Sequence, residues 1–335
     1  MSTGTQRNAE KTGGIVVVGS LNADLTIYCE RLPLPGETVH GTGFAVNPGG
    51  KSANQAVAAS LLGGDVSLIG AVGHDANGEM LLSSADGAGV HVGHVRSVHE
   101  PTGVAVIAVD AHGENNIIIS AGANGTLSPA DVAAAADAFD GAAVVCLCLE
   151  VNPETVEAAA RAGHDAGATV LLNLSPYAPI SQKLAELADV LLVNAHEAAL
   201  FLGLDVNSSP GPSGNGMPGA AADDADWDRI RVRFAERGLQ RVLVTLGGEG
   251  SVVLDSQAAG PNVTKIAPTP VKAVDTTGAG DAFTGAVAAL LAAGQPLAAA
   301  ARFASVAAAL ATTRKGTQAA YPDLADIERQ LASRA

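Results

Sequence analysis

Short runs of β-branched residues alternate along this chain with alanine-rich segments long enough to form helices. Six such runs are expected to be strands, and they cover residues 15–18, 66–72, 144–149, 170–174, 190–193 and 242–245. This alternation is typical of βαβ units, whose strands form a parallel sheet that is buried on both faces. The sequence therefore predicts an α/β fold with a central, largely parallel sheet flanked by helices.

Two stretches break the alternation, at residues 28–44 and 102–120. Each contains strand-like runs joined by tight glycine or proline turns without room for a helix, so we expect antiparallel pairing within each stretch. A small sheet built from them would stand away from the main sheet and would be suited to act as a lid. We place the lid segments at about residues 25–45 and 100–121.

The rest of the chain is expected to form a single domain, residues 14–335. Residues 1–13 are polar and predict a disordered tail, and a stretch rich in Pro, Gly and acidic residues at 207–226 predicts a surface insertion. Gln295 and Pro296 interrupt the alanine-rich segment 286–301, which therefore predicts two helices meeting at a turn and not a membrane span.

Charge and cysteine content argue against several classes of protein. There are 19 Lys and Arg residues against 34 Asp and Glu, and the net charge of −15 argues against a protein that coats nucleic acid or anionic lipid. The three cysteines include no C-x-x-C pair and no metal-ligand spacing, which favours a reducing, cytoplasmic location. Any anionic ligand must be bound by a local device.

The strongest local motif is DTTGAGD, residues 275–281, followed by an alanine-rich helical run. Gly278, Ala279 and Gly280 at a helix start would present backbone N–H groups at the positive end of the helix dipole, which is an anion site. Asp281 would lie in the first turn and could accept a proton from an attacking hydroxyl. An acid that only offsets the helix dipole is the alternative, but a plain helix start does not need three small residues in a row.

A second motif, GGKSANQ at residues 49–55, precedes another helix-like run. Ser52 and Gln55 fit a capping box, which would give both a structural role. Lys51 and Asn54 are three residues apart at the helix entrance, so both can face one ligand. A solvated surface lysine is the competing interpretation of Lys51.

Three further strand ends carry polar or glycine-rich residues, and ligands of open α/β sheets lie beyond the carboxyl ends of strands. Asn22 and Asp24 could hold neighbouring sugar hydroxyls or form an Asx turn. Asn194 and Glu197 fit a helix cap. The loop TLGGEG, residues 245–250, fits either a phosphate cradle or a glycine-rich turn.

Together, GGKSANQAVAA (residues 49–59) and DTTGAGDAF (residues 275–283) resemble the two signatures of the PfkB sugar kinase family, in its ribokinase branch. The resemblance extends from about residue 15 to about residue 322. It implies a ribokinase-like three-layer sandwich with a β lid over the sugar and ATP on the far side. It also implies in-line transfer of the γ-phosphoryl group of ATP to a sugar hydroxymethyl.

The resemblance implies roles for individual residues. Asp281 would be the catalytic base, and Gly278, Ala279 and Gly280 the anion hole. The sugar would be held by Asn22, Asp24, Gly50, Lys51, Asn54, Glu150 and Asp281. ATP would be contacted by Asn194, Thr245, Leu246, Gly247, Gly248, Glu249, Gly250, Gly280 and Ser305, while Glu197 would organise Mg²⁺ and phosphate. The activating monovalent cation, K⁺, would be bound by Asp275, Thr277, Ala311, Arg314 and Gly316.

Two positions depart from the family pattern. Ser52 replaces a glycine of the first signature, and we expect its capping role to make this harmless. Ala320 stands where ribokinases often place a serine on the cation, so one side-chain oxygen is missing there.

The leading hypothesis is an ATP-dependent kinase that phosphorylates the 5-hydroxyl of ribose. The alternatives are a related kinase acting on deoxyribose, a hexose or a nucleoside, and a non-catalytic sugar-binding protein of the same fold. A dinucleotide-dependent oxidoreductase would need Gly-x-Gly after the first strand, where this chain has Gly19-Ser-Leu. Apolar residues that a thin sheet cannot bury on both faces predict a homodimer through the lid; they include Val104, Val106, Ile117 and Ile119.

Overall fold

Nine strands form the main sheet, in the order β13-β12-β11-β10-β9-β8-β1-β4-β5, and four more form a second sheet, in the order β3-β2-β6-β7. The computed structural model describes residues 13–112, 114–205, 216–219 and 221–332. The strands are β1 (Gly14–Val18), β2 (Asn22–Cys29), β3 (Gly41–Gly49), β4 (Val66–Gly73), β5 (His91–Val98), β6 (Gly103–Val109), β7 (Asn115–Ser120), β8 (Ala142–Leu147), β9 (Thr169–Asn173), β10 (Val190–Asn194), β11 (Arg241–Thr245), β12 (Ser251–Asp255) and β13 (Val263–Ile266). All six strands expected from the β-branched runs are present.

The main sheet is parallel from β5 to β11, and only the edge strands β12 and β13 are antiparallel. Its central strands are buried on both faces, which explains their continuous apolar runs. In β1, Ile15 and Val17 belong to one core cluster, whereas Val16 and Val18 belong to the other. The predicted fold class is therefore confirmed.

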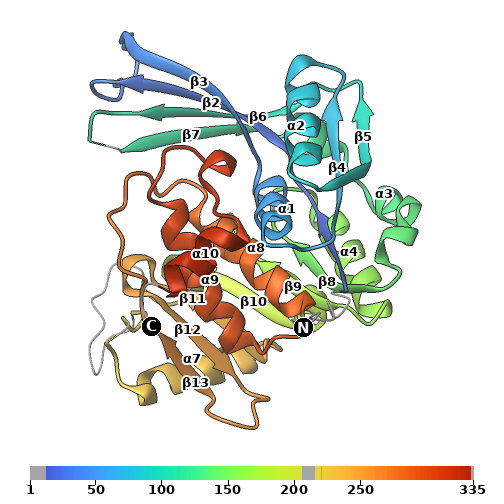
Figure 1. Cartoon of the computed structure of the whole chain (residues 1–335), viewed down its shortest axis with the longest axis vertical. Helices are drawn as coiled ribbons and strands as arrows, with labels where there is room; N and C mark the ends of the chain where they lie inside the picture. The colour runs from blue at the N-terminus through green and yellow to red at the C-terminus, as the bar shows by residue number, and fades with distance from the viewer. Residues whose placement is uncertain (1–12, 113, 206–215, 220, 333–335) are drawn as a thin grey trace, which may run out of the picture.

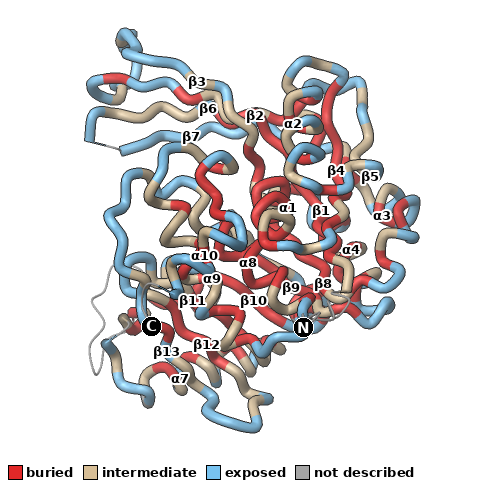
Figure 2. Tube along the Cα trace, in the orientation of Figure 1, coloured by how far each residue is buried: buried red, intermediate tan, exposed pale blue. Residues whose placement is uncertain are grey.

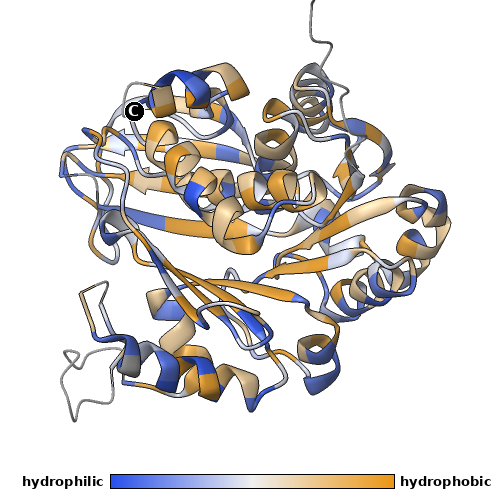
Figure 3. Ribbon diagram, turned by 60° about the horizontal axis from the view of Figure 1, so that its bottom comes forward, coloured by the Kyte–Doolittle hydropathy of each residue, from blue (hydrophilic) through white to orange (hydrophobic). Residues whose placement is uncertain are grey.

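Helices cover both faces of the main sheet (Figures 1 and 3). Residues of α1, α2, α8, α9 and α10 contribute to one core cluster, and residues of α3 to α7 contribute to the other. The α-helices are α1 (Lys51–Leu61), α2 (Ala76–Gly87), α3 (Pro129–Ala134), α4 (Pro153–Asp165), α5 (Gln182–Leu187), α6 (Ala195–Leu202), α7 (Asp224–Ala235), α8 (Ala279–Ala292), α9 (Leu297–Ala311) and α10 (Leu324–Ala332). Short 3₁₀ turns are η1 (Gly122–Thr126), η2 (Ala136–Phe139), η3 (Gly247–Glu249) and η4 (Gln318–Ala320). The two helices expected around Gln295 and Pro296 are α8 and α9.

The small sheet extends from one end of the main sheet and is much more exposed (Figures 1 and 2). It consists of two antiparallel hairpins, β2–β3 and β6–β7, as the sequence predicts, and parallel pairing of β2 with β6 joins them. Because Ile118 pairs with Val106, these two side chains share one face with Val104, while Ile117 and Ile119 lie on the other. The four apolar residues singled out from the sequence are thus divided between the two faces.

Parts of the expected tail and insertion fall outside the described residues. Residues 1–12 and 206–215 lie outside the described part of the chain. Gly13, the last residue of the expected tail, is described, and its N–H donates to the Ala292 carbonyl at 3.3 Å. The prediction that the insertion extends to residue 226 is wrong, because Asp224 begins helix α7. Acidic residues are favourable in a first helical turn, where they face the positive end of the dipole. Among the described residues, no helix is both long and apolar enough to cross a membrane.

Candidate active site

Helix α8 presents its first turn at the centre of the candidate site. Its N-cap, Gly278, has φ 72°, a left-handed conformation that favours glycine. A side chain at that position would also overlap the methyl group of Thr317 and come within 2.7 Å of the Tyr321 hydroxyl. A Cβ at Gly280 would meet no atom within 4 Å, so that side of the turn is open for a ligand.

One N–H group of the predicted anion hole has an acceptor within the protein. The N–H of Ala279 donates to the Thr276 carbonyl at 3.2 Å and so closes the turn that precedes the helix. The next two N–H groups, of Gly280 and Asp281, belong to the first helical turn and have no intrahelical acceptor. An anion at this helix start would therefore meet the N–H groups of residues 280 and 281, next to that of Ala279.

Asp281 is buried, with 7% of its surface exposed, and lies in the first turn of α8 as predicted. Its two carboxylate oxygens accept hydrogen bonds from consecutive residues of α1, Oδ2 from Asn54 Nδ2 and Oδ1 from Gln55 Nε2, each at 3.0 Å. Burial raises the pKa of the Asp281 carboxyl, against the opposing effects of Lys51 and the two amides. A carboxyl group with these neighbours is a candidate general base.

Lys51 begins α1 and lies among carboxylates, so it is not a solvated surface lysine. Burial works to lower its pKa, but the charges of Asp281 and Glu150 outweigh that effect and the pKa is raised. Glu150 follows β8, and its Oε2 accepts hydrogen bonds from the Ser20 hydroxyl at 2.6 Å and from the Lys51 N–H at 3.1 Å. The helix start, the β1 end and the β8 end are thereby held together.

Asn22 and Asp24 lie in strand β2 and not in an Asx turn. Asn22 is buried, and its Oδ1 accepts a hydrogen bond from Asn124 Nδ2 at 2.8 Å. Asp24 lies over Gly49 of β3, where a Cβ would overlap its carboxylate. Burial, and then the charges of Glu150 and Asp281, raise the pKa of Asp24 to about 7. The sugar-site residues predicted from β2, α1, β8 and α8 are therefore brought together.

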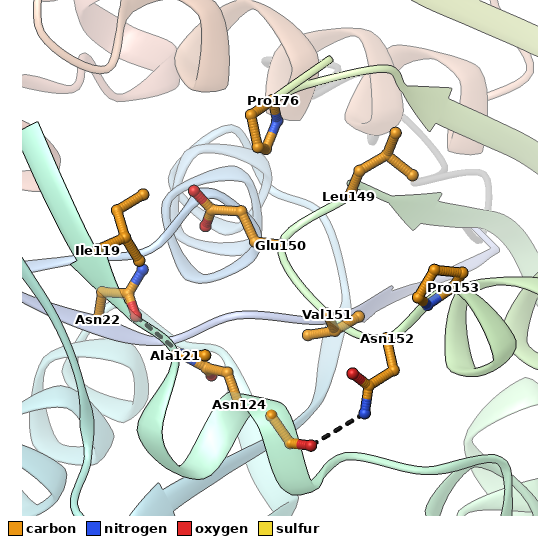
Figure 4. Close-up of a pocket in the computed structure, with 11 residues that line it drawn as sticks. Asn22, Ile119, Ala121, Asn124, Leu149, Glu150, Val151, Asn152, Pro153 and Pro176 are labelled. Atoms are coloured by element: carbon orange, nitrogen blue, oxygen red, sulfur yellow. Dashed lines mark hydrogen bonds between the residues drawn. The ribbon is translucent and has the colours of Figure 1, made fainter. Parts of the chain in front are cut away.

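A cavity of about 290 Å³ adjoins these residues and is shown in Figure 4. Asn22 and Glu150 line it, together with Asn124, Asn152 and Ile119 of the small sheet. Polar amide and carboxylate groups on an otherwise apolar wall suit a small, hydroxyl-rich ligand.

The capping box predicted for Ser52 and Gln55 is wrong. Gly50 is the N-cap of α1 and no side chain caps this helix, so Ser52 lies inside the first turn. Its hydroxyl is buried and lies 3.4 Å from the Val18 carbonyl and 3.1 Å from Cys148 Sγ. Serine fits there because the facing residue is Gly19, whose Cβ would overlap the Ser52 hydroxyl.

The candidate nucleotide residues lie at the ends of β10 and β11. Asn194 caps α6 and forms a reciprocal capping box with buried Glu197, at 2.8 and 2.9 Å, as the structural interpretation predicts. Asn194 pairs with Thr245, so the loop of residues 245–250 begins beside that cap. Side chains at Gly247 and Gly248 would meet no atom within 4 Å, which leaves the loop backbone open to a ligand. Ser305 lies on α9, which packs against β12 and β13.

Three of the five residues predicted to bind a monovalent cation are joined by hydrogen bonds. The Asp275 carboxylate accepts from the N–H groups of Thr277 and Gly316, each at 3.0 Å. Burial opposes ionisation, but these N–H groups hold the pKa of Asp275 below its ordinary value. Ala311 and Arg314 lie on either side of Thr312, whose carbonyl accepts from the Val274 and Asp275 N–H groups. The oxygens of an ionised carboxylate and of backbone carbonyls are the ligands that a hard cation prefers, so these residues fit such an ion.

Sequence reasoning missed several residues of the site. Ser20 and Asn124 bind predicted sugar residues, and Gln318 and Tyr321 bind Asn54 and Gly278. Ser20 lies two residues after the end of β1 and two before Asn22, and that position was a usable signal. The others reach the site through contacts distant in sequence.

A buried carboxylate at a helix start, close to a cavity with polar groups in its wall, together with a glycine-rich loop at the strand ends, is typical of a group-transfer enzyme of the doubly wound α/β class. Comparison with known proteins specifies the class further. The family model described as "pfkB family carbohydrate kinase" matches residues 13–324. The chain therefore belongs to the pfkB family and is a sugar kinase, a phosphotransferase.

Individual proteins are similar in sequence or structure to this chain over nearly its whole length. The ribokinase of Schizosaccharomyces pombe is 36% identical over 322 residues, covering 94% of this chain and 96% of that protein. The deoxyribokinase of Salmonella typhimurium is 33% identical over 324 residues, covering 95% and 98%. A solved structure of Arabidopsis thaliana ribokinase complexed with ribose and ATP has a TM-score of 0.83 and 32% identity, covering 96% of this chain and 99% of that one.

Proposed function

We propose that this sugar kinase transfers the γ-phosphoryl group of ATP to the 5-hydroxyl of D-ribose. The observation that carries the proposal is the position of Asp281, buried at the start of α8 and within electrostatic reach of Lys51, Glu150 and Asp24. The similar Arabidopsis structure is complexed with ribose and ATP, which supports both substrates.

Asp281 is proposed as the base of the reaction. Its carboxylate takes the proton of the sugar hydroxyl, and the hydroxyl oxygen forms a bond to the γ-phosphorus. The bond from that phosphorus to the β,γ-bridging oxygen breaks in line, and ADP leaves. The N–H groups at the start of α8 stabilise the charge on the transferred group.

The sugar is proposed to lie under the small sheet, which acts as its lid. Asn22, Asp24 and Glu150 offer acceptors for ring hydroxyls, and Lys51 and Asn54 offer donors. The backbone of Gly50, at the N-cap of α1, completes the site.

The nucleotide is proposed to lie against the loop of residues 245–250, with Asn194, Gly280 and Ser305 at its edges. Mg²⁺ neutralises phosphate charge during transfer when it is bound. Glu197, whose Oε2 accepts the Asn194 N–H, would organise the magnesium and phosphate through water. K⁺ is assigned to the loops around Asp275, which hold the start of α8.

A phosphorylation assay with ATP over pentoses, hexoses and nucleosides tests the proposal. Ribose should give the highest kcat/KM, with the phosphate on the 5-hydroxyl. Deoxyribose is the second candidate, because a deoxyribokinase is among the similar proteins. A higher kcat/KM for any other acceptor would overturn the assignment of ribose.

The outer face of the small sheet is proposed as a homodimer interface. Strand register places Ile27, Phe44, Val46, Val106 and Ile118 on this face. All five are substantially exposed, with Ile118 at 72% and Phe44 at 65%. Adjacent exposed apolar side chains of this kind mark an interaction surface, and pairing of two such faces would cover both.

A further inference from the structure

Both oxygens of the buried Asp281 carboxylate are held by carboxamides. Asn54 and Gln55 are consecutive residues of α1, yet both reach the same carboxylate. They can do so because α1 and α8 pack backbone to backbone: a Cβ at Gly285 of α8 would lie 2.5 Å from the Gln55 carbonyl. An ionised carboxylate only accepts hydrogen bonds, so each amide must present its NH₂ group and not its oxygen.

Two further groups determine which way these amides point. Asn54 Oδ1 accepts a hydrogen bond from Gln318 Nε2 at 3.0 Å, and Gln318 Oε1 accepts one from the Ser84 hydroxyl at 3.1 Å. Gln55 Oε1 accepts one from the Cys146 thiol at 3.3 Å. Burial raises the pKa of Cys146 far above its ordinary range, so this thiol keeps its proton and can donate. Each amide oxygen therefore faces a donor, and each NH₂ group faces Asp281.

Five charged or titratable side chains from neighbouring parts of the fold lie around Asp281. Glu150 and Asp24 oppose its ionisation and Lys51 favours it, while Cys146 and Tyr321 stay neutral as their own pKa values are raised. One lysine thus balances three carboxyl groups in a buried site. Two hydrogen bonds donated to the carboxylate add to the effect of the lysine, because they favour the charged form.

We propose that Gln55 and Gln318 are positioning residues of Asp281, Gln55 by direct contact and Gln318 through Asn54. They keep the carboxylate ionised in its buried site and fix its rotation toward the sugar hydroxyl. The inference rests on the proposed role of Asp281 as the base. Without Gln318, Asn54 loses the donor that orients its amide, and its oxygen is free to turn toward Asp281.

The test is the pH profile of kcat at saturating ribose and ATP, which reports groups of the substrate-bound enzyme. Gln55→Leu should move the acidic limb up by about one pH unit, the effect of losing one hydrogen bond to a charged group. Gln318→Leu should move it in the same direction by a smaller amount, because Gln318 acts on Asp281 through Asn54. Gln318→Met, which keeps a side chain of similar length, loses the donor and adds no charge, should move it in the same direction as Gln318→Leu. Gln240→Leu is the matched control, because it removes one amide hydrogen bond, to the Ala235 carbonyl, away from this network.

The inference is overturned if kcat falls equally at every pH in the two leucine variants, or if their acidic limbs coincide with that of Gln240→Leu. Thermal unfolding of all variants identifies any that do not fold, and the Gln318→Met profile decides if a leucine variant fails to fold. Asp281→Asn separates this outcome from failure of the proposed function. If Asp281→Asn keeps wild-type kcat, the base is misassigned; if it is inactive while the limbs stay in place, only the roles of Gln55 and Gln318 fail.

Discussion

The phenolic oxygen of Tyr321 lies 3.1 Å from the carbonyl oxygen of Gly278 and donates a hydrogen bond to it. Gly278 is the N-cap of α8, so this bond restrains the turn that carries Gly280 and Asp281. Burial, with added effects of Asp281 and Asp24, raises the pKa of Tyr321 well above its ordinary value, so the hydroxyl remains a donor. A C-terminal segment thereby holds the helix start on which phosphoryl transfer is proposed to depend.

Tyr321→Phe is therefore expected to lower kcat while the KM for ribose and for ATP change little. Loss of one restraining hydrogen bond is worth about 1 kcal/mol, or about five-fold in rate. Tyr177→Phe is the control, because it removes a similar bond from the Leu200 carbonyl. Equal rates in the two variants would show that the hydroxyl of Tyr321 does not act on the turn.

Asp281→Asn is expected to keep the fold and ribose binding but to lower kcat by roughly 100-fold or more, the usual effect of losing general-base help. Calorimetric titration with ribose measures binding separately from turnover. A variant with near wild-type kcat would contradict the role of Asp281.

Asp24 should make ribose binding depend on pH. Its raised pKa of about 7 means that the fraction of Asp24 in the carboxylate form, which would accept hydrogen bonds from sugar hydroxyls, increases as the pH rises through 7. The KM for ribose should therefore fall as the pH rises from about 6 to about 8, a range that brackets the pKa of Asp24, and should then level off. At pH 8, Asp24→Ala should raise the KM for ribose by an amount equivalent to about 1.5 to 3 kcal/mol of binding free energy. In this variant the KM should no longer depend on pH. A fall in ATP affinity with unchanged ribose affinity would show that Asp24 lies in the wrong half of the site.

The strands, and the place of Asp281 on its helix, could be predicted because their signals are local. β-branched runs between alanine-rich segments are sufficient to predict β1 and β4, and glycine followed by a small-residue run predicts the start of α8. Gln55 was misassigned for the same reason. Ser-x-x-Gln is a capping pattern wherever a helix starts at the next residue, but α1 starts at Lys51, which puts Ser52 inside the helix.

Contacts distant in sequence could not be predicted in this way. Gln55 is 226 residues from Asp281, and Gln318 is 264 residues from Asn54. No local pattern indicates such pairs, because they depend on the packing of α1 against α8 and η4. The two faces of the small sheet were also unresolved, since they depend on the register between β6 and β7.

The register makes the dimer prediction specific. Ile118→Asp places a charge on the proposed interface and should give a monomer in sedimentation at micromolar concentration, where the wild type should be a dimer. Ile117→Asp is the matched control, because Ile117 is the neighbouring exposed isoleucine on the opposite face, and it should remain a dimer. A wild-type monomer with full activity would contradict the interface.

The last prediction concerns K⁺. The Asp275 carboxylate already joins the N–H groups of Thr277 and Gly316, so a cation there would stabilise a turn that is partly ordered by the protein itself. K⁺ should then act mainly on kcat, because it fixes the turn before Gly280 without entering the chemistry.

Ala320 gives a direct test of this site. It is buried, so Ala320→Ser places a hydroxyl inside the protein beside these loops, whereas Ala319→Ser places one on the surface. Ala320→Ser should lower the K⁺ concentration needed for half-maximal activation. It should also increase the rise in Tm that K⁺ produces, since a tighter ligand stabilises the folded state more at the same concentration. The Ala319→Ser variant should match the wild type in both measurements. Equal wild-type activity in Na⁺, K⁺ and organic-cation buffers, with no shift in Tm, would show that Asp275 and Tyr321 order the turn without an ion.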